Sequence, residues 1–245
     1  MLREERGRTS LFRGRSVIIF QVSRNISIAP DEFYHIYNRG TEKRDIFSDE
    51  IDRERFVALL YLCNSSEPVH IDSIKKSRGS TSLEVLLQTD RSETLVDICA
   101  YCLMPNHFHL LVHEKEEKGI STYMQKLMTG YTMYFNKTHE RSGVLFQSKF
   151  KATHADEDRY LKYLLSYIHL NPVKLIEPAW KEDGIRNKKA AEKYLRTYRF
   201  SSYLDYLNMP RLESKIINRI ALPDYFRNAR DFQTDITDWL DYRNE

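Results

Sequence analysis

The chain has 245 residues, of which 41% are hydrophobic and 30% charged, values typical of a globular protein with one main domain and appendages. Its longest apolar runs fall well short of the roughly eighteen residues of a membrane helix, and the run at residues 17–20 is too short for a signal-peptide core. We therefore expect a cytoplasmic protein with no membrane contact. The formal net charge of +3 is weak, so a nucleic-acid surface would require local clusters of Lys and Arg.

Such clusters occur in two places. Residues 1–30 are predicted to be a basic N-terminal arm with room for one short strand, and residues 149–199 are also rich in Lys and Arg. Either cluster could instead be an ordinary solvated surface.

The three cysteines, Cys63, Cys99 and Cys102, do not indicate a disulfide framework and suit a reducing compartment. Cys99 and Cys102 have the spacing of a zinc or redox pair, but no second pair follows. They lie in an apolar run that we interpret as a buried strand, on which residues three apart face opposite ways. We interpret both as core thiols.

The predicted elements follow in chain order. An aromatic strand at 33–38 ends at the turn signal Asn38-Arg39-Gly40. Ser48 is predicted to cap a helix that carries Asp49 and Glu50 in its first turn. Residues 64–93 are interpreted as an insertion without an assigned role. The further predicted elements are strands at 95–104 and 107–114, a helix across 120–135, a strand at 150–154 and a helix opened by Asp156, Glu157 and Asp158.

This order predicts an α+β fold, with an antiparallel sheet that has helices on one face. The sequence after residue 175 is predicted to be a mainly helical C-terminal extension across 176–245.

Two pairs of residues have the spacing of a catalytic site. His107 and His109 flank one apolar residue on a predicted strand, so both imidazoles point to the same side of the sheet and could hold one metal ion. Tyr167 and Asn171 are four residues apart and share one face if the helix continues. Pro172 disfavours helical geometry at Asn171, which could then be only a C-cap.

Each of these residues also has a structural interpretation. Isolated histidines on a strand are often only hydrogen-bonded there. Tyrosines at helical spacing, which here include Tyr160 and Tyr163, more often pack than react. His169 is predicted to be structural, His113 to lie beyond the metal position, and His154 has no assigned role.

Three longer stretches contain these residues in a fixed order along the chain. They are MPNHFHLLV at 104–112, GVLFQSKFK at 143–151 and YIHLNPVK at 167–174. Together they resemble the single-tyrosine transposases of the HUH superfamily, and in particular the branch of the REP-associated tyrosine transposases. The resemblance extends over about residues 33–206. It implies a ferredoxin-like or RRM-like transposase domain, and we expect this domain to span residues 31–175.

The resemblance implies a metal-dependent single-strand DNA endonuclease and strand transferase that forms a covalent 5′-phosphotyrosine at hairpin-containing DNA. Tyr167 would be the nucleophile and His107, His109 and Asn171 the ligands of Mg²⁺ or Mn²⁺, since imidazole and oxygen donors with open positions suit these ions. The protein would act as a monomer or homodimer. The alternative is a regulator on the same fold that binds a DNA or RNA hairpin without cutting it, and a relaxase or rolling-circle initiator would share the chemistry.

The DNA contacts are expected outside the catalytic group. Lys149 and Lys151 alternate with Phe150, and Arg39 follows the first strand. Basic side chains interleaved with an aromatic ring can neutralise phosphates and stack on unpaired bases. A half-buried strand with no such role has the same pattern.

Overall fold

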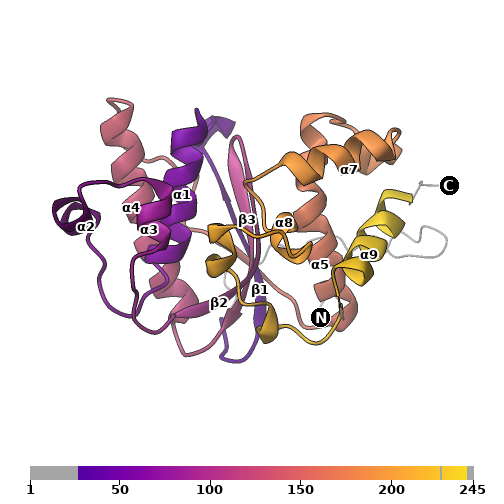
Figure 1. Cartoon of the computed structure of the whole chain (residues 1–245), viewed down its shortest axis with the longest axis horizontal. Coiled ribbons are helices and arrows are strands. Elements are labelled where there is room, and N and C mark those ends of the chain that lie inside the picture. The colour runs from indigo at the N-terminus through magenta and orange to yellow at the C-terminus, as the bar shows by residue number, and fades with distance from the viewer. Residues whose placement is uncertain (1–26, 227, 242–245) are drawn as a thin grey trace, which may run out of the picture.

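The computed structural model describes residues 27–226 and 228–241, and a four-stranded antiparallel sheet runs through the middle of this part (Figure 1). The strand order is β2-β3-β1-β4, which places β1 in the interior and brings together strands that are distant in sequence. This is the ferredoxin-like order, so the predicted fold class is confirmed. The strands are β1 (Phe33–Arg39), β2 (Val96–Met104), β3 (His107–Glu114) and β4 (Lys151–His154).

The pairing of β1 with β3 determines which side chains share a face of the sheet. Tyr37 pairs with His109, and Arg39 pairs with His107. Because side chains alternate along a strand, His35 and Tyr37 project to the same face as the two histidines of β3. Ile36 and Leu110 pair with each other and belong to the opposite face.

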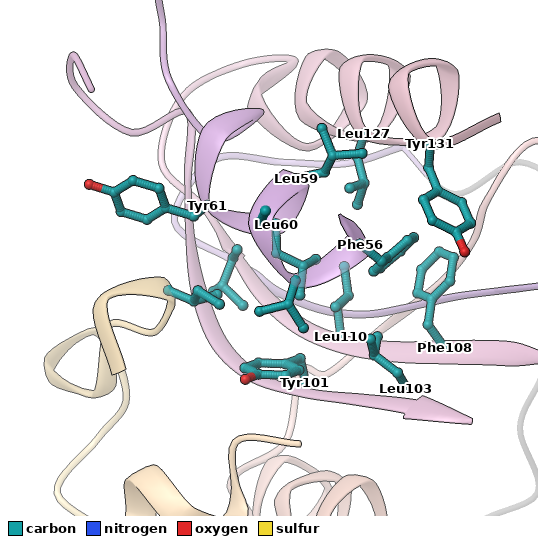
Figure 2. Close-up of a cluster of buried hydrophobic side chains, with 14 of the residues drawn as sticks. Phe56, Leu59, Leu60, Tyr61, Tyr101, Leu103, Phe108, Leu110, Leu127 and Tyr131 are labelled. Carbon is teal, nitrogen blue, oxygen red and sulfur yellow. The ribbon is translucent and has the colours of Figure 1, made fainter. Parts of the chain in front are cut away.

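Two long helices cover the face that carries Ile36. These are α1 (Glu50–Leu62) and α4 (Gly119–Thr138), the pair of helices that the sequence pattern predicted on one side of the sheet. Figure 2 shows Phe56 and Leu60 of α1 against Phe108 and Leu110 of β3. The rings of Phe56 and Phe108 lie 5.0 Å apart between centroids, so burial of aromatic and aliphatic side chains holds this layer together.

The N-terminus of α1 differs in one respect from the prediction. Asp49, and not Ser48, is the N-cap, and its carboxylate accepts a hydrogen bond from the backbone N–H of Asp52 at 2.8 Å. Ser48 instead donates its backbone N–H to the carboxylate of the buried Asp52. A carboxylate caps a helix as well as a hydroxyl does, so sequence alone did not separate these neighbours.

The insertion at 64–93 contains two short helices, α2 (Ile71–Arg78) and α3 (Leu83–Leu87). Leu86 and Leu87 of α3 are buried in the same core as α1. The insertion therefore extends the first helical layer, on the side of the sheet away from the two histidines of β3.

The second face of the sheet is also covered, which the prediction of helices on one face did not anticipate. Helix α5 (Asp158–Leu170) packs on β2 and β3 and buries Leu164, Leu165 and Ile168. Cys99 and Cys102 face this layer together, because a β-bulge between Ile98 and Ala100 shifts the alternation. The prediction that they face opposite ways was wrong, whereas their prediction as buried thiols is confirmed.

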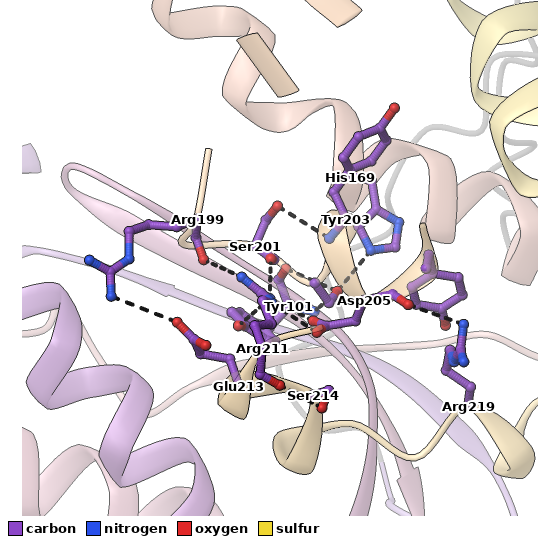
Figure 3. A network of polar contacts seen from close by, with 12 residues as sticks. Tyr101, His169, Arg199, Ser201, Tyr203, Asp205, Arg211, Glu213, Ser214 and Arg219 are labelled. Carbon is purple, nitrogen blue, oxygen red and sulfur yellow. Dashed lines mark hydrogen bonds and ion pairs between the residues drawn. The ribbon is translucent and has the colours of Figure 1, made fainter. Parts of the chain in front are cut away.

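Beyond α5 the chain forms a mainly helical extension, as predicted. Its elements are η2 (Asn171–Leu175), α6 (Trp180–Asp183), α7 (Lys188–Thr197), α8 (Tyr203–Tyr206), η3 (Leu212–Ile216), η4 (Arg219–Ala221) and α9 (Ala229–Asp241). Figure 3 shows how Arg211 attaches this extension to β2. Its guanidinium donates to the hydroxyl of Tyr101 at 3.0 Å and to the carboxylate of Asp205.

Most of the predicted basic arm, residues 1–26, lies outside the described residues. Within the described part, no helix is long and apolar enough to span a membrane.

Candidate active site

The two histidines of β3 lie side by side on the face of the sheet that α5 covers. The ring centroids of His107 and His109 are 5.1 Å apart, and His109 is only 6% exposed. Burial lowers the pKa of His107 to about 4 and lowers the pKa of His109 well below its usual value. Both rings are therefore neutral at pH 7, the form in which imidazole binds metal.

Hydrogen bonds orient both rings. Nδ1 of His107 lies 2.6 Å from Oδ1 of Asn106, whose own Nδ2 donates to the carbonyl of Lys43. The amide oxygen can only accept, so His107 carries its proton on Nδ1 and keeps a lone pair on Nε2. Nδ1 of His109 lies 2.8 Å from Nε2 of the buried His35. When His109 is the donor, its Nε2 also presents a lone pair.

Tyr167 approaches the histidines from α5. Its ring lies 5.4 Å from the ring of His109 and 6.0 Å from that of His35, edge-on in both cases. Burial raises the pKa of Tyr167, while a hydrogen bond with Asn171 and the charge of Lys174 act in the opposite direction. Nζ of Lys181 donates a hydrogen bond to the Tyr167 hydroxyl at 2.9 Å. The phenol oxygen thus lies among groups that can stabilise its anion.

Two further tyrosines of α5 form a stack with Tyr167. Tyr163 stacks on Tyr167 with 5.9 Å between ring centroids, and Tyr160 stacks on Tyr163. Of the three, Tyr167 is the one that contacts His109 and lines the pocket described below.

Asn171 is the C-cap of α5 and also lies in the site. Its backbone keeps helical angles, φ −51° and ψ −40°, because the chain continues into η2 with Pro172 near its start. Its Nδ2 donates to the carbonyl of Tyr167 at 2.9 Å, which leaves Oδ1 as the side-chain atom able to bind a cation. Asn171 is 1% exposed.

These residues line one pocket of about 300 Å³. His107 and His109 come from β3, Tyr167 from α5 and Asn171 from η2, so the structure brings together all four residues that the sequence selected. Among the described lining residues are four cationic side chains and no carboxylate. The cations are Arg39, Lys151, Lys174 and Lys181.

The four candidate DNA contacts separate into two groups. Arg39 and Lys151 line the pocket. Phe150 packs against the core on the opposite face of the sheet, and Lys149 is exposed outside the pocket lining. Alternation along the chain separates Phe150 from Lys151, because neighbouring side chains point to opposite faces. Lys149 comes before β4 begins.

The three other histidines that the sequence analysis considered have structural partners. His169 is buried, as predicted for a structural residue, and its Nε2 lies 2.7 Å from the hydroxyl of Ser202. His113 lies 3.2 Å from Asp97 and is not among the pocket residues, as predicted. His154 lies 2.9 Å from Glu32.

Three residues that form hydrogen bonds with the selected side chains did not emerge from the sequence. Lys174, which lines the same pocket, was not selected either. Asn106 precedes His107 in the same motif, so its proximity was a usable signal. His35 lies two residues before Tyr37 on β1 and therefore on the same face of the sheet. Its contact with His109, however, depends on the pairing of strands that are over 70 residues apart in sequence. Lys181 belongs to the extension, to which no role was assigned.

A protein-family model described as IS200-like transposase matches residues 31–171, more than half of the chain. The chain belongs to the IS200-like transposase family. A solved structure of a REP-associated tyrosine transposase bound to a REP hairpin aligns with 78% of this transposase and 88% of its own chain, at 13% identity and a TM-score of 0.43. A search of curated proteins finds no match. The family match ends at Asn171, so it includes all four selected residues and leaves Lys181 outside.

Proposed function

We propose that this transposase cleaves and rejoins single-stranded DNA through a covalent 5′-phosphotyrosine at Tyr167. One observation carries the proposal: a single pocket gathers a half-buried phenol with two neutral imidazoles and an amide oxygen. The matched family supports the same class of reaction.

The donor set fits a divalent cation with open coordination positions. Nε2 of His107, Nε2 of His109 and Oδ1 of Asn171 would hold Mg²⁺ or Mn²⁺, and no cluster of three or more His, Cys, Asp or Glu competes with it in the described ranges. When bound, the ion would act as a Lewis acid that neutralises charge on the scissile phosphate.

The protein side chains supply the other requirements of phosphoryl transfer. Arg39, Lys151 and Lys174 place positive charge around the position where a phosphate would bind. Tyr167 attacks phosphorus, its Oη–P bond forms, and the P–O3′ bond breaks to give a free 3′ hydroxyl. The phosphotyrosine conserves the bond energy, so a second 3′ hydroxyl can reverse the step and complete strand transfer.

We further propose that residues 31–175 are the catalytic domain and that its substrate is single-stranded or hairpin-containing DNA. The scissile phosphate must reach a pocket on the sheet face that α5 partly covers. An unpaired backbone can adapt to such a pocket, whereas a continuous duplex keeps its phosphates on a rigid cylinder. Single strands are expected to be cut and perfect duplex spared.

The test is a labelled hairpin with single-stranded flanks, incubated with the protein and Mg²⁺ or Mn²⁺ and then denatured. Wild-type protein is expected to retain the label covalently, and Tyr167→Phe to lose it while still binding DNA. Tyr163→Phe is the matched control on the same helix and should keep the adduct. His107→Ala should slow cleavage about 10²-fold or more, given the size of metal contributions to such transition states.

The alternative function is a hairpin-binding regulator that does not cut. It predicts salt-sensitive DNA binding with no adduct in any divalent ion. Cleavage that persists in excess chelator would contradict the metal assignment, and an adduct that persists in Tyr167→Phe would contradict the nucleophile.

A further inference from the structure

Lys181 has a different position from the other cations of the pocket. Its Nζ donates to Oη of Tyr167 at 2.9 Å and lies 4.2 Å from the centroid of the same ring. Arg39, Lys151 and Lys174 line the same pocket. The ammonium of Lys181 is thus directed at the atom that would form the bond to phosphorus.

A closed loop in the C-terminal extension holds Lys181 next to Tyr167. After α5 the chain passes through η2, and the carboxylate of Glu177 then accepts hydrogen bonds from the backbone N–H groups of Arg186 and Asn187 at 2.8 and 3.0 Å. This contact closes the segment 177–187, and α6 with Lys181 lies inside it. The position of Lys181 therefore depends on a defined structure that follows the matched family segment.

Lys181 is an exposed residue, and its hydrogen bond to Tyr167 lies at the surface. Partial desolvation lowers the pKa of Lys181 to about 8, opposed by the neighbouring Glu182, and the amine remains mostly protonated at neutral pH. When the phenol of Tyr167 loses its proton, its oxygen carries a negative charge in a partly desolvated site. A charge-assisted hydrogen bond to such an atom is about twice as strong as a neutral one.

We propose that Lys181 is a catalytic residue whose ammonium stabilises the negative charge on Tyr167 Oη, both when this oxygen attacks phosphorus and when it leaves during rejoining. The inference rests on the proposed function. In cleavage the Oη–P bond forms and the P–O3′ bond breaks. The phenol proton passes to water, the 3′ oxygen leaves with the electron pair and takes a proton from water, and Lys181 remains protonated throughout. Rejoining is the reverse.

The role is different from that of a phosphate-binding lysine. A phosphate contact would contribute mainly to DNA affinity and its salt dependence. A group that acts on the nucleophile contributes to the rate from the saturated complex, in both directions, because attack and departure pass through the same transition state.

The experiment measures single-turnover rates with saturating protein, labelled single-stranded hairpin DNA and Mg²⁺. The variants are Lys181→Met, Lys181→Arg and, as a matched control, the exposed Lys189→Met on α7. Lys181→Met is expected to slow adduct formation at least about tenfold, and rejoining of the isolated adduct with a free 3′-hydroxyl strand by a similar factor. DNA affinity and the thermal unfolding midpoint should stay close to wild type. Lys181→Arg should recover part of the rate, and Lys189→Met should match wild type.

Three results would overturn the role of Lys181 while leaving the proposed function intact. They are a wild-type rate in Lys181→Met, a loss of affinity with an unchanged rate from the saturated complex, and a Lys181→Arg variant as slow as Lys181→Met. A wild-type protein that forms no adduct would overturn the proposed function itself, and the role of Lys181 with it.

Discussion

Nε2 of His35 lies 2.8 Å from Nδ1 of His109, so two buried imidazoles on neighbouring strands hold each other in position. His35 is 2% exposed, and burial lowers its pKa to about 3, so it remains neutral. A histidine that binds metal through one nitrogen is usually oriented through the other. His35 provides this orientation for His109.

We predict that His35→Leu weakens Mn²⁺ binding and slows cleavage by about 10- to 100-fold, the usual effect of removing a group that orients a metal ligand. The control is His154→Gln, on the neighbouring strand β4, which should retain wild-type cleavage. Metal titration and single-turnover cleavage measure the two effects. Unchanged metal affinity in His35→Leu would show that His109 needs no such support.

The charge around the pocket predicts that metal and DNA bind cooperatively. The proposed ligands His107, His109 and Asn171 are all neutral, and the described residues around them contribute cations but no carboxylate. A divalent ion held there would gain its compensating charge from the DNA phosphate. Mn²⁺ should therefore bind Tyr167→Phe protein much more tightly with hairpin DNA than without it, as measured by electron paramagnetic resonance of free Mn²⁺. Equal affinity in both cases would contradict this coupling.

Lys151 is predicted to contact a DNA phosphate. Lys151→Ala should weaken binding to single strands irrespective of their sequence and reduce the slope of log affinity against log salt concentration by about 0.7, the value for one lost contact. Fluorescence anisotropy across a salt series measures the slope. Lys189→Ala is the comparison, and an identical slope in the two variants would remove Lys151 from the DNA interface.

The residues that the sequence identified share local geometry. His107 and His109 face one side because strands alternate, and Tyr167 and Asn171 share a helical face that survives Pro172 because η2 continues the turn. These relations span at most four residues. The contacts of His35 and Lys181 depend instead on strand register and on the path of the chain after α5, which local periodicity does not encode.

The covering of both faces of the sheet illustrates the same limit. Strand β2 is buried along nearly its whole length, a pattern typical of strands packed on both sides. The apolar run predicts a buried strand, but it does not indicate that α5 supplies the second layer. The β-bulge that turns Cys99 and Cys102 to the same face likewise cannot be predicted from the spacing of the residues.

Buried histidines predict a loss of stability in mild acid. Burial lowers the pKa of His169 to about 3, while in the unfolded chain it returns to about 6.5. Between these values the unfolded state binds more protons, so the free energy of unfolding falls as the pH falls, by up to about 1.4 kcal/mol per pH unit for each proton. Urea midpoints at pH 7 and pH 5 should differ less in His169→Gln than in wild type. The exposed His70→Gln should show the wild-type difference, and an unchanged difference in His169→Gln would contradict the prediction.

The central claim is that Tyr167 becomes covalently attached to DNA, and the direct measurement is peptide mapping of the adduct. Wild-type protein is incubated with hairpin DNA and Mg²⁺, digested with nuclease and protease, and its peptides are analysed by mass spectrometry. The account predicts a 5′-nucleotide mass on Tyr167, in the peptide that follows Lys162 and ends at Lys174. A nucleotide on Tyr163 in the same peptide, or on any other residue, would contradict it.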